Sequence, residues 1–365
     1  MSIGIIGAGQ LGRMMALAGY PLGLRFTFLD KSEDSPGAQV GDIVLGDFMQ
    51  AEDIRRLAGQ VELLTYDVEN VPVEALEAAA SGIPVHPGPA ILGAAQDRLR
   101  EKECFARHGI ETAPYRSVDS LAELESAVKA LGLPAMLKRR RMGYDGRGQQ
   151  LIRSEAEIAK AWEGLSGAPL ILEGFVDFER EVSLIGVRNR SGDTRFYPLS
   201  ENRHEDGILR LSIAPAADPA LQATAEKQLA ALMEAHDYAG ILTVEYFEKA
   251  GRLIANEMAP RVHNSGHWTI EGAATSQFEN HLRGILDLPL GSTRPRGVSA
   301  MINCLGRMPA LEGVIRHEDA HYHDYGKAPR PRRKLGHITV VRDDRASLDA
   351  VIDELLPLVK AAEQA

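Results

Sequence analysis

The chain has 365 residues, which at about 100 to 200 residues per domain predicts two or three domains around cores that need no disulfide bonds. Its 41 Lys and Arg residues against 51 Asp and Glu give a formal net charge of -10, which excludes a general affinity for nucleic acid or anionic lipid. Only two cysteines occur, and no apolar run reaches the roughly 18 to 20 residues that span a bilayer. Because no basic and then hydrophobic leader opens the chain, we expect a cytoplasmic protein without a membrane segment.

About the first hundred residues alternate short apolar runs with helix-like stretches, which predicts a parallel α/β unit. The expected strands cover residues 2–6, 25–29, 61–66 and 83–85, and the expected helices cover residues 10–18 and 73–80. The cluster Pro87-Gly88-Pro89 interrupts the pattern, so we place the first domain boundary close to it.

The remainder of the chain has a different pattern. Helices are expected over residues 94–108 and 121–131, and a strand over 135–138 leads into a glycine-rich segment. Strand-like segments then dominate and predict an antiparallel α+β region, with strands over 170–173, 181–188, 195–199, 240–247 and 253–257. A basic segment, residues 327–334, precedes a strand near 337–341 and a closing helix over 347–360.

The first motif is Gly7-Ala8-Gly9-Gln10-Leu11-Gly12, a G-x-G-x-x-G sequence directly after a strand, with Asp30 at the end of the second strand. This spacing is typical of a dinucleotide-binding turn, in which amides at a helix N-terminus meet a phosphate. A different phosphate ligand, or a tight structural turn alone, would satisfy the same pattern.

A second glycine-rich segment contains Gly143, Gly146 and Gly148, and follows Lys138. It lacks the G-K-[ST] sequence of a P-loop. A mobile loop beside a lysine could fold over a triphosphate and exclude water, although an exposed basic hairpin would have the same composition.

Two carboxylates, Glu245 and Glu257, lie in neighbouring apolar strands that Lys249-Ala250-Gly251-Arg252 connects. A hairpin would bring them side by side. Together with Asn256 they offer hard oxygen ligands of the kind that Mg²⁺ prefers, which we favour over a pair of solvated strand acids.

His263 and His267 are four residues apart, but Pro260 and Gly266 argue against a helix and hence against a zinc pair. With Arg261 alongside, this segment suits an anion or a polar small molecule. The basic segment 327–334 is isolated in an otherwise acidic chain, which favours a phosphate-binding site over a nucleic-acid-binding surface.

In this order, the motifs resemble the ATP-grasp superfamily over nearly the whole chain, and within it the purine-pathway ligases that carboxylate 5-aminoimidazole ribonucleotide with bicarbonate. The resemblance rests on residues 7–14, 65–71, 138–140, 143–149, 181–183, 202–208 and 256–268, of which the last segment is the most specific. It implies an N-terminal Rossmann-like parallel-sheet domain (1–93), a small central lid domain (94–168) and a C-terminal antiparallel α+β domain (169–365) with a terminal subdomain from about 296.

The resemblance also implies a role for individual residues, with ATP and Mg²⁺ as cofactors. Contacts to ATP would come from Arg98, Lys138, the loop Gly143, Tyr144, Asp145, Gly146, Arg147, Gly148 and Gln149, the adenine-binding strand Glu173, Gly174, Phe175 and Val176, and Glu181 and His204. Glu245 and Glu257, with Asn256, would hold Mg²⁺, and Arg261, His263, Asn264 and Lys327 would surround the bicarbonate-derived group. The ribonucleotide would contact Gln10, Leu11, Glu69, Tyr144, Arg147, Arg333 and Lys334.

The implied reaction forms carboxyphosphate from ATP and bicarbonate, releases ADP and phosphate, and carboxylates the amine in de novo IMP synthesis by a cytoplasmic homodimer. Three alternatives stay open at this point. A sister ligase would act on glycinamide ribonucleotide with formate, but residues 263–268 resemble the carboxylating enzymes. An NAD-dependent oxidoreductase explains only the first glycine motif, and a non-catalytic nucleotide-binding protein leaves the intact set of ligands without a use.

Overall fold

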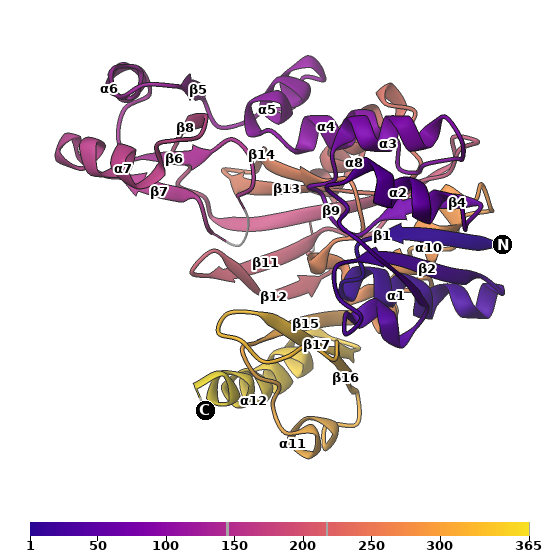
Figure 1. The fold of residues 1–365 in the computed structure, drawn as a ribbon. Helices are drawn as coiled ribbons and strands as arrows, with labels where there is room; N and C mark the ends of the chain where they lie inside the picture. Colours follow the sequence, from indigo (N-terminus) through magenta and orange to yellow (C-terminus); the bar gives the residue numbers. More distant parts are fainter. Residues whose placement is uncertain (144–145, 217, 365) are drawn as a thin grey trace.

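The computed structural model describes residues 1–143, 146–216 and 218–364, and the strands within them form three sheets (Figure 1). The N-terminal sheet is parallel, in the order β3-β2-β1-β4. Its strands are β1 (Ser2–Ile6), β2 (Arg25–Asp30), β3 (Asp42–Leu45) and β4 (Leu63–Tyr66). Its helices are α1 (Gln10–Gly19), α2 (Ala51–Ala58) and α3 (Val73–Ala80), with short 3₁₀ turns at Tyr20–Leu22 and Pro36–Gln39. This order is that of a Rossmann-like half, as expected.

One expected strand of this domain is wrong. Residues 83–85 form no named strand, because only Val85 makes an isolated parallel bridge, to Leu64. Pro84 lacks the N–H group that a strand would need to continue the ladder. Strand β3, a short strand at the edge of the sheet, is absent from the predicted elements.

The expected helix over residues 94–108 is two helices, α4 (Pro89–Ala95) and α5 (Arg98–Arg107). Asp97 separates them: its carboxylate accepts a hydrogen bond from the Leu99 N–H at 3.0 Å and so caps α5. The same carboxylate binds Arg140 at 2.8 Å. The break therefore attaches the start of α5 to the following sheet.

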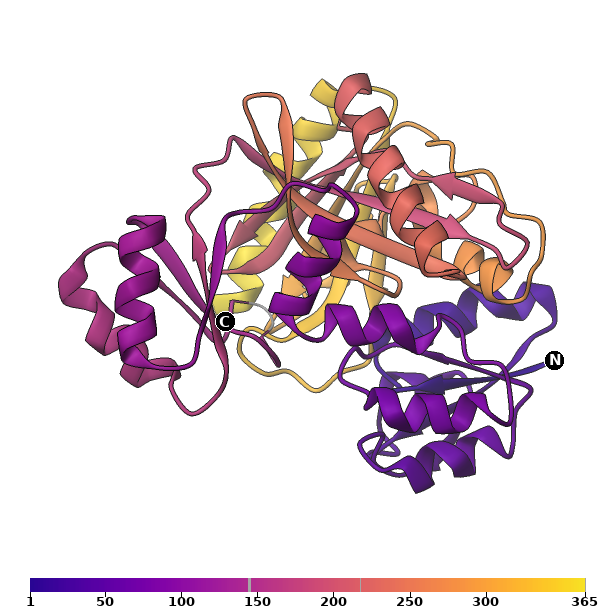
Figure 2. The ribbon, with the colours of Figure 1, turned by 90° about the horizontal axis from the view of Figure 1, so that it is seen from above.

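That second sheet is antiparallel, in the order β5-β8-β6-β7, and we call it the lid sheet. It consists of β5 (Tyr115–Val118), β6 (Ala135–Arg139), β7 (Gln149–Ile152) and β8 (Leu170–Gly174), covered by α6 (Leu121–Leu131) and α7 (Ile158–Leu165), with a 3₁₀ turn at Glu155–Glu157. It has its own hydrophobic core. Figure 2 shows the lid sheet and the N-terminal sheet on opposite sides of the segment α4–α5 that joins them.

The third sheet is the largest and is antiparallel, in the order β14-β13-β9-β11-β12-β15-β17-β16, with β10 on β9. Its strands are β9 (Arg180–Arg188), β10 (Thr194–Phe196), β11 (Ser200–Glu205), β12 (Ile208–Ala214), β13 (Gly240–Lys249), β14 (Arg252–Ala259), β15 (Val298–Leu305), β16 (Ala320–Asp324) and β17 (Lys334–Arg342). Its helices are α8 (Pro219–Ala235), α9 (Thr269–Gly272), α10 (Gln277–Ile285), α11 (Leu311–Ile315) and α12 (Arg345–Gln364), with a 3₁₀ turn at Asn264–Gly266. Helix α8 and the hairpin β11–β12 are absent from the predicted elements, and the predicted strand over 195–199 spans the end of β10.

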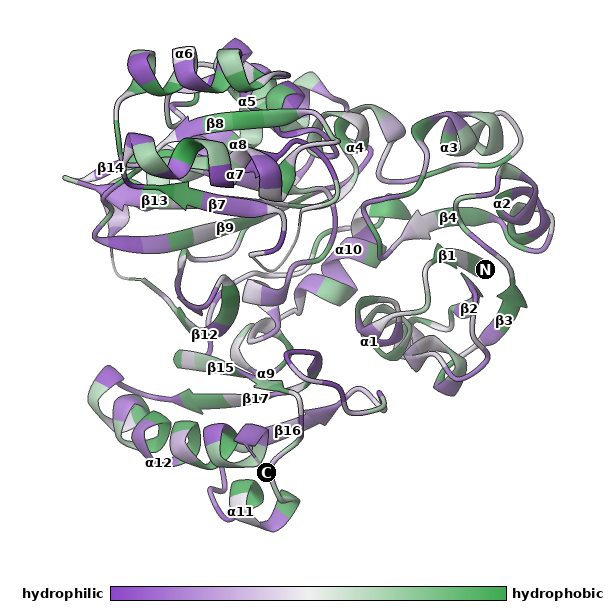
Figure 3. Ribbon diagram, turned by 60° about the vertical axis from the view of Figure 1, so that its left-hand side comes forward, coloured by the Kyte–Doolittle hydropathy of each residue, from purple (hydrophilic) through white to green (hydrophobic). Residues whose placement is uncertain are grey.

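The strands β15, β16 and β17 lie close to where the terminal subdomain was expected to begin, yet they continue the large sheet through β12. Helix α12 covers this end of the sheet with Leu348, Ile352, Leu355 and Val359 on its buried side. In Figure 3 this helix carries hydrophobic residues on one side and hydrophilic residues on the other, which is the pattern of a helix that packs on a sheet. The domain boundaries at 93, 168 and about 296 stay predictions.

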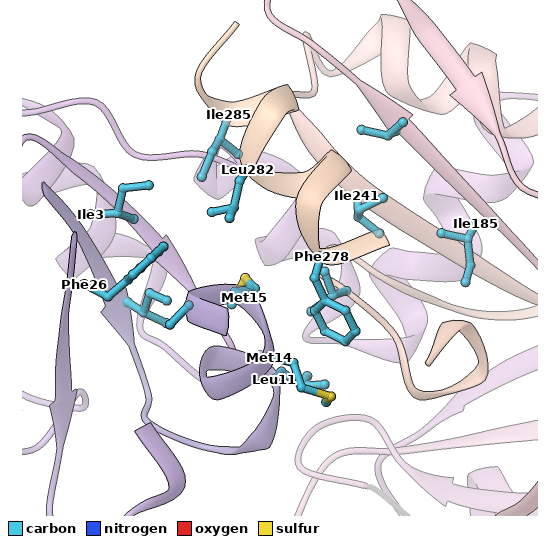
Figure 4. Close-up of a cluster of buried hydrophobic side chains, with 14 of the residues drawn as sticks. Ile3, Leu11, Met14, Met15, Phe26, Ile185, Ile241, Phe278, Leu282 and Ile285 are labelled. Atoms are coloured by element: carbon cyan, nitrogen blue, oxygen red, sulfur yellow. The ribbon is translucent and has the colours of Figure 1, made fainter. Parts of the chain in front are cut away.

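One hydrophobic core joins the N-terminal sheet to the large sheet (Figure 4). Phe26 from β2 and Met15 from α1 meet Leu282 of α10, behind which Ile241 of the large sheet is buried. At Gly19 the approach is close: a Cβ atom there would lie 2.3 Å from Phe26 and 2.9 Å from Leu282. The two sheets therefore share a continuous interior. No helix of the described residues is long and apolar enough to cross a membrane.

His281 links the same two sheets by hydrogen bonds. Its fully buried ring accepts from the Ile241 N–H at 3.2 Å through Nδ1, which leaves Nε2, 3.0 Å from the Thr65 hydroxyl, to carry the proton of the neutral ring. Burial lowers the pKa of His281 to about 3. The ring is therefore neutral in the folded protein at every pH above that value.

This linkage predicts a pH-dependent stability. Below its ordinary pKa of 6.5, the unfolded state takes up a proton on His281 that the folded state does not accept, so stability falls as the pH falls from about 6.5 towards 3. The contribution is about 1.4 kcal/mol per pH unit. Urea unfolding at pH 7.5 and pH 5.0 should show a smaller loss for His281→Gln, which cannot titrate but retains a donor and an acceptor. An identical pH dependence in both proteins would contradict this account.

Candidate active site

Two adjoining cavities open among the described residues where the three sheets meet, with volumes of about 430 and 360 Å³. The first lies at the carboxyl ends of β1 and β4, the usual position of a ligand site in a parallel sheet. The second lies between the lid sheet and the strands β13 and β14. Arg98, His204, Glu245 and Glu257 line both cavities, so the two are parts of one site.

The structure brings most of the residues expected from the sequence into these cavities. The first is lined by Gln10, Leu11, Glu69, Arg98, Gly143, His204, Glu245, Glu257, Arg261, His263, Asn264 and Lys334. The second is lined by Arg98, Lys138, Gly146, Arg147, Gln149, Glu173, Gly174, Phe175, Val176, Glu181, His204, Glu245, Asn256 and Glu257. Gly148, Lys327 and Arg333 do not line either cavity, and Tyr144 and Asp145 lie outside the described residues.

The expected pair of glutamates lies on the hairpin β13–β14, where Glu245 and Glu257 are direct cross-strand partners. A register shift follows Glu245, so Asn256 is an extra residue on β14. In a regular strand, residues 256 and 257 would point to opposite faces, but a bulge can turn both towards one side. This explains how Asn256 and Glu257 line the same cavity.

Glu245 and Glu257 differ in charge state because their neighbours differ. Burial, and then the negative charge of Glu257, raise the pKa of Glu245 to about 7. Burial would also raise the pKa of Glu257, but Arg98, 3.0 Å away, holds it below its ordinary value. His263 Nε2 lies 3.3 Å from Glu245, and burial keeps the pKa of this histidine well below 6.5.

A buried charge cluster lies behind the second cavity. The Glu173 carboxylate is 2.9 Å from the Lys138 ammonium and 3.6 Å from the Lys102 ammonium. Lys102 is fully buried and also donates to the Asn256 carbonyl at 2.7 Å. Although burial alone would raise it, these cations lower the pKa of Glu173 to about 2. A single lysine from α5 thus joins β8 of the lid sheet to the strand that carries Glu257.

Three segments meet over the opening of the site. In the glycine-rich segment, a Cβ atom on Gly146 would lie 3.0 Å from the Asp206 carbonyl oxygen in the turn between β11 and β12. Arg332 of the basic segment donates to the same carbonyl at 2.9 Å. The glycine-rich segment is therefore packed against the rest of the site and is not an isolated basic hairpin.

The basic segment also approaches the first glycine motif. The Lys327 ammonium donates to the side-chain oxygen of Gln10. Burial, and then the charge of Arg333, lower the pKa of Lys327 to about 8. Residues from the two ends of the chain thus contact each other beside the first cavity.

The segment after β14 holds its polar groups by side-chain contacts. Arg261 forms an ion pair with Glu69 at 2.9 Å, and the amides of Asn264 and Asn303 bind each other at 2.7 and 3.1 Å. His267 lies elsewhere, fully buried with its ring 5.0 Å from that of His337. The Gln277 amide contacts both histidines, at the His263 carbonyl (2.7 Å) and at His267 Nδ1 (3.3 Å), but only His263 lines the first cavity.

Sequence reasoning missed several residues of the site. Lys102 could have been suspected because it follows Arg98 by four residues and so shares its face of α5. Glu101 follows Arg98 by three residues and gives the same signal; it accepts from the Met258 N–H at 2.7 Å, and burial raises its pKa to about 8. The stacked rings of Phe178 and Phe247, 4.7 Å apart, come from segments far apart in the sequence.

A divalent cation fits the residues of the hairpin β13–β14. Glu245 and Glu257 are cross-strand partners that line the same cavities, and the side-chain oxygen of Asn256 is buried without a hydrogen-bond partner among the described residues. Nowhere among the described residues do three or more His, Cys, Asp or Glu side chains form a group that could hold a metal ion by themselves. Two carboxylates suffice for Mg²⁺, which otherwise uses phosphate oxygens and water.

Comparisons with known proteins identify the family. The ATP-grasp domain family matches residues 103–278, the ribonucleotide synthetase preATP-grasp domain matches 1–96, and the C-terminal domain of phosphoribosylaminoimidazole carboxylase matches 299–351. N5-carboxyaminoimidazole ribonucleotide synthase of Pseudomonas aeruginosa is 50% identical over 361 residues, covering 99% of this chain and 100% of the relative. The chain belongs to the N5-carboxyaminoimidazole ribonucleotide synthase family.

Solved structures of members of this family support the same assignment. The synthetase from Thermus thermophilus is 54% identical, with a TM-score of 0.93 over 98% of both chains. The synthase from Aspergillus clavatus in complex with ADP and 5-aminoimidazole ribonucleotide is 33% identical, with a TM-score of 0.93 over 99% of this chain and 98% of that one. As a member of the family, this chain is an ATP-dependent ligase with the ATP-grasp fold, which sets aside the NAD-dependent oxidoreductase.

The buried lysine of this ligase leads to a prediction. Lys102→Met removes one of the two ammonium groups beside Glu173, so we expect the free energy of unfolding to fall by up to about 3 kcal/mol. Thermal unfolding measures the loss, and Lys129→Met, at an exposed position on α6, is the matched control. If Lys102 acts through Glu173, the change should be smaller in a Glu173→Gln background. Equal effects in both backgrounds would show that the two residues act independently.

Proposed function

We propose that the protein carboxylates 5-aminoimidazole ribonucleotide with bicarbonate and ATP, giving N5-carboxyaminoimidazole ribonucleotide, ADP and phosphate in purine biosynthesis. The main support is that Arg98, His204 and the glutamate pair border both cavities at once. A nucleotide in the second cavity would therefore have its phosphates beside a substrate in the first.

ATP fits the second cavity. Phe175 and Val176 offer apolar contacts for the adenine, and Glu181 is positioned for the ribose by a 2.7 Å contact with His204. Although burial alone would lower it, this contact raises the pKa of His204. Lys138 and Arg98 provide the positive charge that phosphoryl transfer requires, because that reaction depends on positioning and charge neutralisation.

Mg²⁺ would be held by Glu245 and Glu257, with the unpartnered side-chain oxygen of Asn256 beside them. When bound there, it would neutralise charge on the phosphates of ATP. Arg98 keeps Glu257 ionised, and Lys102 fixes the backbone at Asn256, so this chain presents its ligands at the boundary between the two cavities.

The chemistry explains why a closed site is needed. A bicarbonate oxygen attacks the γ-phosphorus of ATP, and the bond between that phosphorus and the oxygen of the β-phosphate breaks. ADP departs as the leaving group, and carboxyphosphate is formed. The amine nitrogen then bonds to the carboxyl carbon, taken from carboxyphosphate or from CO₂ released by it, while phosphate departs and the amine loses a proton. Carboxyphosphate hydrolyses readily, so the segment 143–149 would serve to exclude water.

The carboxyl group would form beside Arg261, His263 and Asn264, with Lys327 nearby. Glu69, the Gln10–Leu11 turn and Lys334 line the first cavity and would contact the ribonucleotide. Arg147, which lines the second cavity, Arg333, which lines neither, and Tyr144 belong to the expected binding set by the resemblance alone. We also propose that the enzyme works in the cytoplasm as a homodimer, as the resemblance implied.

ADP release tests this function directly. The purified protein with Mg²⁺, ATP and bicarbonate should release ADP much faster when 5-aminoimidazole ribonucleotide is added. Glycinamide ribonucleotide with formate is the parallel arm for the sister ligase. Stimulation in that arm alone would overturn the proposal, and ATP binding without turnover in either arm would indicate a non-catalytic protein.

The metal assignment predicts the behaviour of Glu257→Gln. This variant keeps the shape of the side chain but loses the charge that a hard cation requires, so we expect turnover to fall at least about 100-fold with thermal unfolding little changed. Glu179→Gln, at an exposed position next to β9, is the control. Near-normal activity of Glu257→Gln would show that this carboxylate does not serve the reaction.

The basic segment predicts a selective effect on one substrate. Arg333→Ala should raise the KM for the ribonucleotide about 10-fold or more, since a charged contact to phosphate is worth about 1.5 to 3 kcal/mol. The KM for ATP should stay within about twofold. A larger effect on ATP than on the ribonucleotide would place this arginine in the nucleotide site instead.

A further inference from the structure

The first glycine motif does not have a free anion site, because a carboxylate of the chain already lies there. Asp67 directly follows β4, and its Oδ2 accepts a hydrogen bond from the Gly12 N–H at the start of α1, at 3.1 Å. The side chain is almost fully buried. In a dinucleotide-binding fold, a phosphate oxygen would accept from amides at this position.

The three glycines of the motif provide the space for this carboxylate. A Cβ atom on Gly7 would lie 2.0 Å from Asp67 Oδ1, and on Gly9 and Gly12 it would lie 2.9 and 3.2 Å from Asp67 Oδ2. Gly7 also has a φ of 91°, which L residues rarely adopt. Asp67 lies against all three glycines, so its fit accounts for much of the spacing G-x-G-x-x-G without a bound nucleotide; at Gly12 the ring of Phe28, 3.1 Å from a Cβ atom there, limits the space as well.

The second acid of the fingerprint is also used internally. Asp30 ends β2, where a dinucleotide-binding protein has the acid that holds a ribose. Here its Oδ2 accepts from the Ala8 N–H at 3.0 Å, inside the glycine turn. Both acids therefore fix the turn from within.

We propose that Asp67 determines which part of the ribonucleotide this turn contacts. Its carboxylate excludes phosphate from the start of α1 and holds Gln10 and Leu11 towards the substrate. A second anion beside this carboxylate would be repelled in a poorly solvated place. The phosphate of the substrate is left to the basic segment, which Lys327 attaches to Gln10. This inference rests on the proposed function, and Asp67 is in this sense a positioning and specificity residue.

Asp67→Asn is the first variant for the test. It retains an oxygen for the Gly12 amide but removes the charge and adds two N–H donors at a site built for a carboxylate. We expect the KM for 5-aminoimidazole ribonucleotide to rise about 10-fold, with the KM for ATP within about twofold of the wild type. Asp34→Asn, at an exposed position of the same domain, is the matched control. Equal increases in both KM values, or none, would overturn the proposal.

Asp67→Ser tests the exclusion of anions separately. Removing the carboxylate exposes the amides at the start of α1, so sulfate should inhibit this variant competitively with the ribonucleotide at a concentration about 10-fold lower than for the wild type. An unchanged inhibition constant would overturn the exclusion of phosphate. If the serine variant does not fold, the inhibition constant for sulfate is measured with Asp67→Asn, which also lacks the negative charge.

The wild-type assay separates this inference from the proposed function. If 5-aminoimidazole ribonucleotide does not stimulate ADP release by the wild type, the proposed function fails. If it does stimulate release, and both Asp67 variants behave like Asp34→Asn, only the role of Asp67 is wrong.

Discussion

The burial of Glu173 between two lysines is the constraint on which the geometry of this site depends. A carboxylate without exposure to water is tolerated only with opposite charge beside it, and here that charge comes from two elements, β6 through Lys138 and α5 through Lys102. Because Lys102 also binds the backbone of β14, the lid sheet, helix α5 and the large sheet are fixed to one another where ATP is proposed to bind.

The junction between the N-terminal sheet and the large sheet is mainly apolar. The N-terminal sheet and the large sheet share one core through α1 and α10, and His281 adds neutral hydrogen bonds between β4 and β13. This packing places the carboxyl ends of β1 and β4 opposite the hairpin β13–β14. The two halves of the site, one for each proposed substrate, therefore meet at a fixed distance that a rigid interior maintains.

Positive and negative side chains alternate along the site, from the proposed ATP cavity to the proposed ribonucleotide cavity. Arg98, Lys102 and Lys138 lie near the second cavity, the glutamate pair marks the boundary, and the basic segment lies beyond the first cavity. A chain of net charge -10 thus places several cations where anionic ligands are expected. Asp67 fits the same logic, because it removes one anion site that the sequence had suggested.

Features that depend on near neighbours in the chain could be predicted without the fold. The proximity of Glu245 and Glu257 was predictable because a short turn at Ala250-Gly251 folds their strands into a hairpin, but the bulge at Asn256 that makes them direct partners was not. Strands β1, β2 and β4 followed from their local apolar pattern. The motif segments also indicated the family, since their residue types reflect the ligands.

The distant groups that complete these segments became evident only from the packing of the sheets. Asp67 reaches the glycine turn because β1 and β4 are adjacent parallel strands although 55 residues separate Gly12 from Asp67. In the same way, Asp97 divides a continuous helical pattern because Arg140 fixes it from another part of the chain. Such contacts depend on how the chain crosses between sheets, and a local pattern carries no information about that.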